Sequence, residues 1–200
     1  EQKQKQDLKD IIFTKKQNVE STKQIREKVL VNLKNDLKAL EDQEDKFLEQ
    51  SKEITNKIVA LQSANEYIGG VFGWPVPGYY KVGSGFGMRN HPILKKNKMH
   101  TGIDIGAKSG MDVVAVNSGK VIYSGYYGGY GNTIIIDHGG KVSTLYAHNS
   151  ILIANEGDKI EKGDVISKIG STGLSTGPHL HFEVRENGSP VNPMKYLKGK

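Results

Sequence analysis

The positions of glycine and proline divide this chain into two parts of different physical character. All 24 glycines and all 6 prolines lie at or after Gly69, and residues 1–68 contain neither. Because glycine and proline are the strongest helix breakers, their absence permits one long helix. The density of glycine after residue 68 favours short strands joined by turns. We therefore expect a coiled-coil helix over residues 1–68, a glycine-containing hinge over residues 69–73 and a separate domain over residues 74–200.

An apolar repeat with alternating spacings of four and three residues runs through the second half of the helical segment. All but two of its nine positions, Glu44 and Ser51, are apolar. The nine positions are Leu33, Leu37, Leu40, Glu44, Phe47, Ser51, Ile54, Ile58 and Leu61. This repeat places the side chains on one helix face and is typical of a coiled coil. A helix of this length would extend roughly 100 Å, because each residue adds about 1.5 Å. The following domain is too small to cover the whole helix, so much of the apolar face needs another partner.

The partner that we expect for this face is a second copy of the chain. Pairing would use the residues Leu33, Leu40, Phe47, Ile54 and Leu61. In the cell, the same segment would instead engage a membrane-bound regulator that controls access to the site described below. The alternative is an amphipathic helix that packs on its own domain.

After residue 68, short runs rich in β-branched and aromatic residues are separated by Gly, Asn, Asp and Ser. The runs cover residues 112–116, 119–123, 132–137, 142–148, 159–160, 165–169 and 179–185. Hairpin-type turn sequences recur at residues 138–140, 155–157 and 186–188. Helical periodicity is confined to residues 193–197. The pattern predicts an all-β domain of antiparallel strands.

Composition excludes several kinds of chemistry and partner. The chain has no cysteine, which excludes disulfides, thiolate zinc sites and a cysteine nucleophile. The net charge of +6 belongs to residues 69–200, but the charge is spread and no platform of aromatic and basic residues is present. We therefore expect no nucleic-acid partner. No apolar run approaches the length of a membrane-spanning helix, and no leader opens the sequence.

The six histidines carry the most informative pattern. They are His91, His100, His138, His148, His179 and His181. His179 and His181 alternate along a predicted strand, so both imidazoles share one face. His100 and Asp104 add an imidazole and a carboxylate, although a straight strand would separate them by about 13 Å. The chain must therefore bend between them, which Gly102 permits, and the set predicts a metal site.

Three segments resemble the lysostaphin-type (LytM-domain) zinc metallopeptidases, which hydrolyse bacterial peptidoglycan. They are Met99-His-Thr-Gly-Ile-Asp-Ile-Gly-Ala107, Leu145-Tyr-Ala-His-Asn-Ser150 and Gly170-Ser-Thr-Gly-Leu-Ser-Thr-Gly-Pro-His-Leu-His-Phe-Glu-Val184. The resemblance covers about residues 74–197. It implies an all-β fold with a central groove and hydrolysis of peptide bonds in cross-links or stem peptides. It also implies an extracellular or cell-envelope location, with an export signal outside this sequence.

The resemblance assigns roles to five residues. It implies that His100, Asp104 and His181 bind Zn²⁺, and that His148 and His179 form a catalytic pair that does not bind the metal. Three protein ligands leave the fourth zinc position open, as in catalytic sites. The sequence lacks HExxH, so an imidazole must take the place of the glutamate base. Which of the two histidines is the base stays open.

Three more residues have alternative interpretations. Glu183 follows His181 by two residues, so its side chain points to the same face of the predicted strand as the two histidines. It is either a carboxylate that orients an imidazole or a surface charge. His138 lies in a turn and is expected to be structural, and His91 is structural or lines the groove.

The principal alternative function is a catalytically inactive coiled-coil regulator that recruits or activates another cell-wall hydrolase. Inactive relatives typically lack a residue of the zinc site, whereas all five positions are present here. The sequence therefore favours the enzyme. The bond that it cuts, a direct D,D cross-link or a glycine bridge, stays open.

Overall fold

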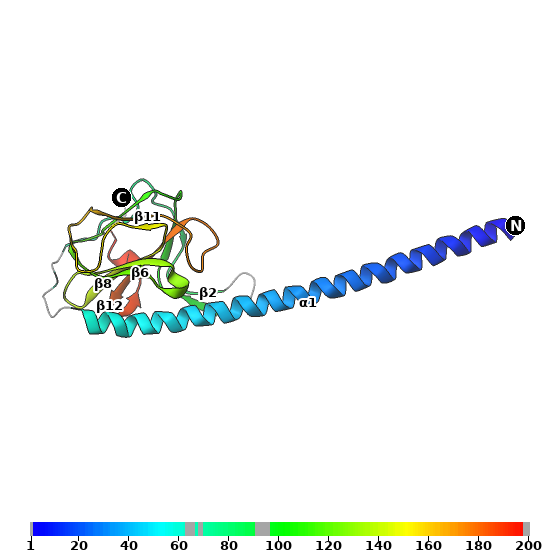
Figure 1. Cartoon of the computed structure of the whole chain (residues 1–200), viewed down its shortest axis with the longest axis horizontal. Coiled ribbons are helices and arrows are strands. Elements are labelled where there is room, and N and C mark those ends of the chain that lie inside the picture. Colours follow the sequence, from blue (N-terminus) through cyan, green and yellow to red (C-terminus); the bar gives the residue numbers. More distant parts are fainter. Residues whose placement is uncertain (1, 63–66, 68–69, 91–96, 198–200) are drawn as a thin grey trace. The chain divides into compact units, whose positions relative to one another are not determined.

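The computed structural model describes residues 2–62, 67, 70–90 and 97–197. The chain divides into two compact units, residues 1–42 and residues 43–200 (Figure 1). A single helix, α1 (Gln2–Leu61), contributes to both. Its formation follows from a sequence of strong helix formers without glycine or proline. No helix in the described part of the chain is both long and apolar enough to cross a membrane.

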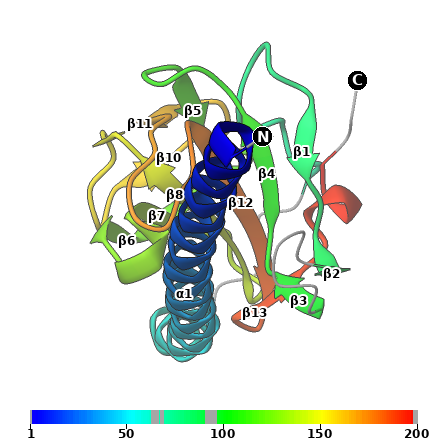
Figure 2. The ribbon, with the colours of Figure 1, turned by 90° about the vertical axis from the view of Figure 1, so that its right-hand side faces the viewer.

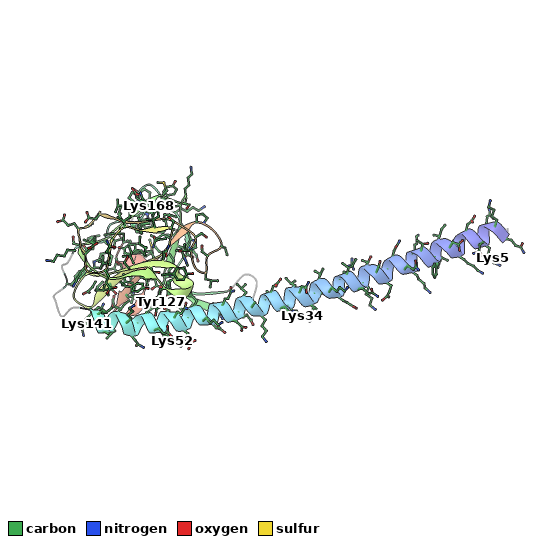
Figure 3. All side chains as sticks on the ribbon, viewed as in Figure 1. Lys5, Lys34, Lys52, Tyr127, Lys141 and Lys168 are labelled. Carbon is green, nitrogen blue, oxygen red and sulfur yellow. The ribbon has the colours of Figure 1, made fainter. Side chains whose placement is uncertain are left out.

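The first unit consists of the first two thirds of α1 alone. Most of its side chains are exposed, including the large apolar residues Ile12, Val19, Leu30 and Leu33, which are 51%, 68%, 56% and 53% exposed. Leu37, Leu40 and Glu41 are half-buried. Lys5 and Lys34 project from the helix in the same segment (Figure 3).

Within the described part of the chain, all the strands belong to the second unit, and the strand pairings are antiparallel. The strands are β1 (Val82–Ser84), β2 (Gly87–Asn90), β3 (Asn97–His100), β4 (Ile103–Gly106), β5 (Asp112–Val114), β6 (Gly119–Tyr126), β7 (Asn132–Asp137), β8 (Val142–Asn149), β9 (Ile151–Leu152), β10 (Lys159–Ile160), β11 (Val165–Lys168), β12 (His179–Glu186) and β13 (Ser189–Val191). The main sheet has the order β1-β4-β12-β8-β7-β6-β10, with β13 also on β12 (Figure 2). Two smaller sheets contain β5-β11-β9 and β2-β3. The predicted fold class, a long helix followed by an antiparallel β domain, is confirmed.

The main sheet has two faces with different coverings, as β12 shows. Its even-numbered apolar residues lie in the larger apolar cluster of the domain: Leu180, Phe182 and Val184. Its odd-numbered residues alternate to the opposite face, which we call the histidine face: His179, His181, Glu183 and Arg185. Residues paired with them or lying nearby supply an apolar surface: Ile122, Ile135, Leu145 and Ala147.

The last turns of α1 cover this apolar part of the histidine face. Ile54 and Ile58 are 0% exposed and join the cluster formed by Ile135, Leu145 and their neighbours. The end of the helix can be followed beside β12 in Figure 1. Lys52 projects from the outer side of the same segment (Figure 3).

This packing corrects the expected self-pairing for part of the helix. Phe47 and Ile54, two of the residues expected to meet a second copy, instead pack on the β domain of the same chain. The alternative of an amphipathic helix on its own domain therefore holds for residues 47–58. Heptad spacing could not distinguish the two, because a sheet and a second helix both require one continuous apolar face.

Candidate metal centre and active site

Three side chains from three strands of the domain converge on one point. His100 lies at the end of β3, Asp104 lies in β4, and His181 lies in β12 directly opposite Asp104. The Nε2 atom of His100 lies 3.2 Å from both Asp104 Oδ1 and His181 Nδ1. The atoms His181 Nδ1 and Asp104 Oδ1 lie 2.9 Å apart. The sequence placed these residues in one site, and the structure brings them together.

The bend that makes this possible lies at Thr101 and Gly102, between β3 and β4. A Cβ atom on Gly102 would lie 2.4 Å from the carbonyl oxygen of Phe182 and 3.0 Å from Cε1 of His181. Glycine is therefore required because β12 approaches closely, and not only because the chain turns.

The outer nitrogen of each imidazole in this cluster faces a fixed acceptor. Nδ1 of His100 donates to the carbonyl oxygen of Gly85 at 2.7 Å. Nε2 of His181 donates to the carboxylate of Glu183 at 3.0 Å. This arrangement directs the inner nitrogens, His100 Nε2 and His181 Nδ1, at Asp104, as is typical of metal-binding histidines.

The donor set fits a zinc ion. In a tetrahedral site with bonds of 2.0–2.1 Å, neighbouring ligand atoms are about 3.3 Å apart. The three separations of 2.9–3.2 Å are close to this value. Two imidazoles and one carboxylate leave a fourth position for a water or a substrate oxygen. Among the described residues, this is the group of histidines and carboxylates that could hold a metal.

Two further histidines lie beside the cluster. The rings of His148 and His179 have centroids 4.8 Å apart, and the ring of His148 lies 5.8 Å from that of His181. Nδ1 of His148 donates to the carbonyl oxygen of Thr172, and Nδ1 of His179 to that of Gly177, both at 2.8 Å. Nε2 of His179 lies 3.8 Å from Asp104 Oδ1. In both imidazoles, Nε2 is therefore the nitrogen available for proton transfer.

The position of His148 depends on an unusual backbone conformation. Ala147 is paired with His181 and shares its face, so strict alternation would turn His148 to the other side of the sheet. The backbone of His148 instead has φ of 62°, in the left-handed region that non-glycine residues seldom adopt. This conformation allows His148, as well as the adjacent Ala147, to reach the histidine face. Backbone strain of this kind is concentrated at functional sites.

The electrostatics of the site separate the roles of its groups. Burial lowers the pKa of His148 to about 3, with smaller contributions from His181 and His179, so this imidazole is neutral at pH 7. In the metal-free protein, burial would raise the pKa of Asp104, but its contacts with His100 and His181 outweigh burial and hold this pKa below its usual range. Asp104 is therefore a carboxylate at neutral pH.

A buried ion pair lies directly behind His181. Glu183 and Arg185 are both 0% exposed, and Arg185 Nε donates to Glu183 Oε2 at 2.6 Å. The hydroxyl of Tyr130 donates to the other carboxylate oxygen, Oε1, at 3.0 Å. Of the two interpretations of Glu183, the structure favours a carboxylate that orients an imidazole over a surface charge.

Sequence reasoning missed Tyr130, Arg185 and the helix residues that contact them. Arg185 could have been found from the alternation of side chains along the strand, because it follows Glu183 by two residues and therefore shares its face. Tyr130 lies in a short 3-10 segment, Gly128–Tyr130, with no such signal. His138 is 0% exposed and bonds to the carbonyl of Ser118 and the hydroxyl of Thr144, as a structural residue would. His91 lies outside the described residues.

The fold and the site are similar to those of a class of metallopeptidases. The model of peptidase family M23 matches residues 98–193. A 36% identical solved structure, the catalytic domain of lysostaphin from Staphylococcus simulans, has a TM-score of 0.52, covering 58% of this chain and 91% of that chain. A zinc-containing peptidase from Vibrio cholerae is 34% identical with a TM-score of 0.60, covering 66% of this chain and 40% of that one. The chain belongs to peptidase family M23.

Curated relatives include both enzymes and activators. The DD-carboxypeptidase/endopeptidase Mpg of Neisseria meningitidis is 50% identical over 116 residues, which are 58% of this chain and 27% of that protein. The murein hydrolase activator NlpD of Salmonella dublin is 43% identical over 97 residues, which are 48% of this chain and 26% of that protein. The chain thus spans about a quarter of the length of the curated relatives that it matches.

Proposed function

We propose that this protein is a zinc-dependent endopeptidase that hydrolyses peptide cross-links or stem peptides of bacterial peptidoglycan. One observation carries the proposal. Two imidazole nitrogens and a carboxylate oxygen converge within 3.2 Å of one another, and two further imidazoles lie beside them. The names of the relatives, a DD-carboxypeptidase/endopeptidase and lysostaphin, support a peptide of the cell wall as substrate.

His100, Asp104 and His181 would hold the zinc ion, which supplies Lewis acidity and lowers the pKa of a bound water. His148 and His179 are the groups that move protons. Each is fixed by a backbone carbonyl at Nδ1 and presents Nε2 to the site, and His148 is neutral at pH 7. One accepts a proton at Nε2 from the attacking water. The other, when it carries a proton on both ring nitrogens, donates from Nε2 to the oxygen that becomes negative at the scissile carbonyl.

The end of α1 regulates this activity in the proposed function. Residues 47–58 cover the apolar part of the histidine face, and the ring of Phe47 lies 6.1 Å from that of His181. A wall peptide that runs along this face needs the space that the helix takes. A partner in the cell envelope, such as a membrane-bound regulator that binds α1, would move the helix and open the face.

A second candidate is a regulator that activates another wall hydrolase without cutting bonds itself. The similarity to the activator NlpD favours it. The two candidates differ in the use of the site, since an activator needs the surface of the domain but not its zinc chemistry.

The test uses the full chain with Zn²⁺ and purified peptidoglycans that contain either direct cross-links or glycine bridges. Mass spectrometry of the products should show newly cut peptide bonds in one of the two. An Ile54→Asp variant, in which the helix is released, should cut faster, and the same variant with Asp104→Asn should not cut. If no variant cuts but the chain stimulates a separate wall hydrolase, the activator function is correct instead.

A further inference from the structure

The carboxylate of Glu183 connects a metal-site histidine to the buried interior of the domain. Its Oε1 atom accepts from His181 Nε2 and from the hydroxyl of Tyr130, both at 3.0 Å, and its Oε2 atom accepts from Arg185 Nε. Both carboxylate oxygens are therefore bonded, and the side chain is 0% exposed. Glu183 has one arrangement available to it, and that arrangement keeps the proton of His181 on Nε2.

Arg185 connects Glu183 to the end of α1. Its Nη1 atom donates to the carbonyl oxygen of Ser51 at 3.1 Å and to Thr55 Oγ1 at 3.2 Å. Its Nη2 atom donates to Ser51 Oγ at 2.9 Å. On the domain itself, the same guanidinium also reaches the carbonyl of Gly188 and the hydroxyl of Tyr130. The helix thus supplies three of the acceptors that this buried cation requires.

These contacts form a continuous path from the helix to the metal site. A buried ion pair is costly unless its remaining hydrogen-bonding groups find partners. When residues 51 and 55 leave, Arg185 loses acceptors and is exposed to water, so it holds Glu183 less firmly. Glu183 in turn is the group that fixes the ring orientation of His181.

We propose that Glu183 is the positioning residue for His181, and that Ser51 and Thr55 strengthen its hold through Arg185. Docking of the helix and binding of metal at His181 then favour each other. This inference rests on the proposed function, because that function makes His181 a zinc ligand. A chain with a covered face would retain its metal firmly until the helix is moved.

The coupling has a consequence in both directions. If the docked helix raises zinc affinity, zinc must raise the stability of the docked helix by the same factor. If Glu183 and Arg185 served only to stabilise the fold, the docked helix would not raise zinc affinity and zinc would not stabilise the docked helix. The two properties can be measured without any substrate.

The test measures zinc affinity of the full chain by competition with a chromophoric chelator. Glu183→Gln should weaken binding by about 10–100-fold, the usual effect of losing a partner of a metal-binding histidine. The double variant Ser51→Ala/Thr55→Val should weaken it several-fold. Lys52→Ala, an exposed change on the same helix turn, is the matched control and should leave zinc affinity unchanged. Circular dichroism confirms that each variant is folded.

Amide hydrogen exchange provides the reciprocal measurement. Zinc should slow exchange over residues 47–58 in the wild-type chain, and this effect should be smaller in Glu183→Gln. A folded Glu183→Gln variant with wild-type zinc affinity would overturn the positioning role. Unchanged affinity and exchange in the double variant would overturn the helix connection. If the coupling is found but no wall peptide is cut, the proposed function fails and this inference stands.

Discussion

The ring of Phe47 in α1 stacks on the ring of Tyr130 in the β domain, with centroids 4.3 Å apart and an angle of 28° between the planes. Tyr130 also donates to Glu183, so this stacking lies next to the group that orients His181. The contact joins helix packing, aromatic geometry and the metal centre within a few side chains. It explains why residues 47–58 belong to the same compact unit as the strands.

The first prediction concerns the stability of this packing. Ile54→Ala should destabilise the β domain by about 2–5 kcal/mol, because it removes a large side chain that is fully buried. Val59→Ala is the control on the same helix. Its side chain is 55% exposed, so the change should be within about 0.5 kcal/mol. Urea unfolding followed by the fluorescence of the single tryptophan, Trp74, measures both. Equal losses in the two variants would contradict the observed packing.

The second prediction concerns the metal. The wild-type chain should bind about one equivalent of zinc, and Asp104→Asn should lose it, because the change removes one of three ligand groups. Glu161→Gln, an exposed charge change elsewhere in the domain, is the control and should retain the metal. Elemental analysis after gel filtration measures the zinc content. Retention of stoichiometric zinc by Asp104→Asn at wild-type affinity would remove Asp104 from the ligand set.

The third prediction separates proton transfer from metal binding. His148→Ala and His179→Ala should each retain zinc and should lower wall hydrolysis by about 10²–10⁴-fold, the usual contribution of a positioned acid or base. The reason is that both imidazoles present Nε2 to the site while backbone carbonyls fix Nδ1. Zinc content and product formation are measured on the same preparations. Wild-type turnover in either variant would exclude that histidine from the chemistry.

Much of the fold and site could be predicted from sequence because the signals are local. The glycine-free stretch predicts α1, and alternation in β12 places His179 and His181 on one face. The strands β1 to β4, β9 and β13 were not predicted. Each has only two to four residues, and a run this short is identified only where turn residues clearly bound it, as for β10. The partner of the helix could not be predicted either. An apolar face is defined by spacing along the helix, but its partner is defined by contacts distant in sequence, such as Ser51 with Arg185.

The position of His148 was also beyond sequence reasoning, for a different reason. Its motif suggested a role, yet strict alternation would have turned its side chain away from His181. The left-handed backbone that redirects it is a local exception maintained by the surrounding fold.

The fourth prediction concerns pH in the metal-free protein. Burial lowers the pKa of His148 to about 3, whereas an unfolded histidine has a pKa near 6.5. Between these values the unfolded chain binds the extra proton, so stability is fully present above pH 6.5 and is lost as the pH falls. The protonation difference at His148 should therefore lower the free energy of unfolding by about 2 kcal/mol between pH 7.5 and pH 5. Burial also lowers the pKa of His138, which adds loss in the same direction.

The measurement is urea unfolding at pH 7.5 and pH 5 in the presence of a chelator. His148→Gln should reduce the loss of stability on acidification by about 2 kcal/mol. An identical pH dependence in wild type and His148→Gln would show that this imidazole is not buried in its neutral form.

The last prediction concerns self-association of the first unit. Large apolar side chains in residues 2–42 are exposed, including Ile12, Val19, Leu30 and Leu33. An exposed apolar stripe on a long helix favours a second helix, and the expected partner is another copy of this chain. Because Phe47 and Ile54 are already packed on the β domain, pairing should depend on the upstream residues instead. Multi-angle light scattering should show dimers for the wild type, monomers for Ile12→Asp/Leu33→Asp, and dimers for the control Lys5→Asp/Lys34→Asp. A wild-type chain that is strictly monomeric at high concentration would rule out self-pairing and leave the exposed stripe for a different partner in the cell envelope.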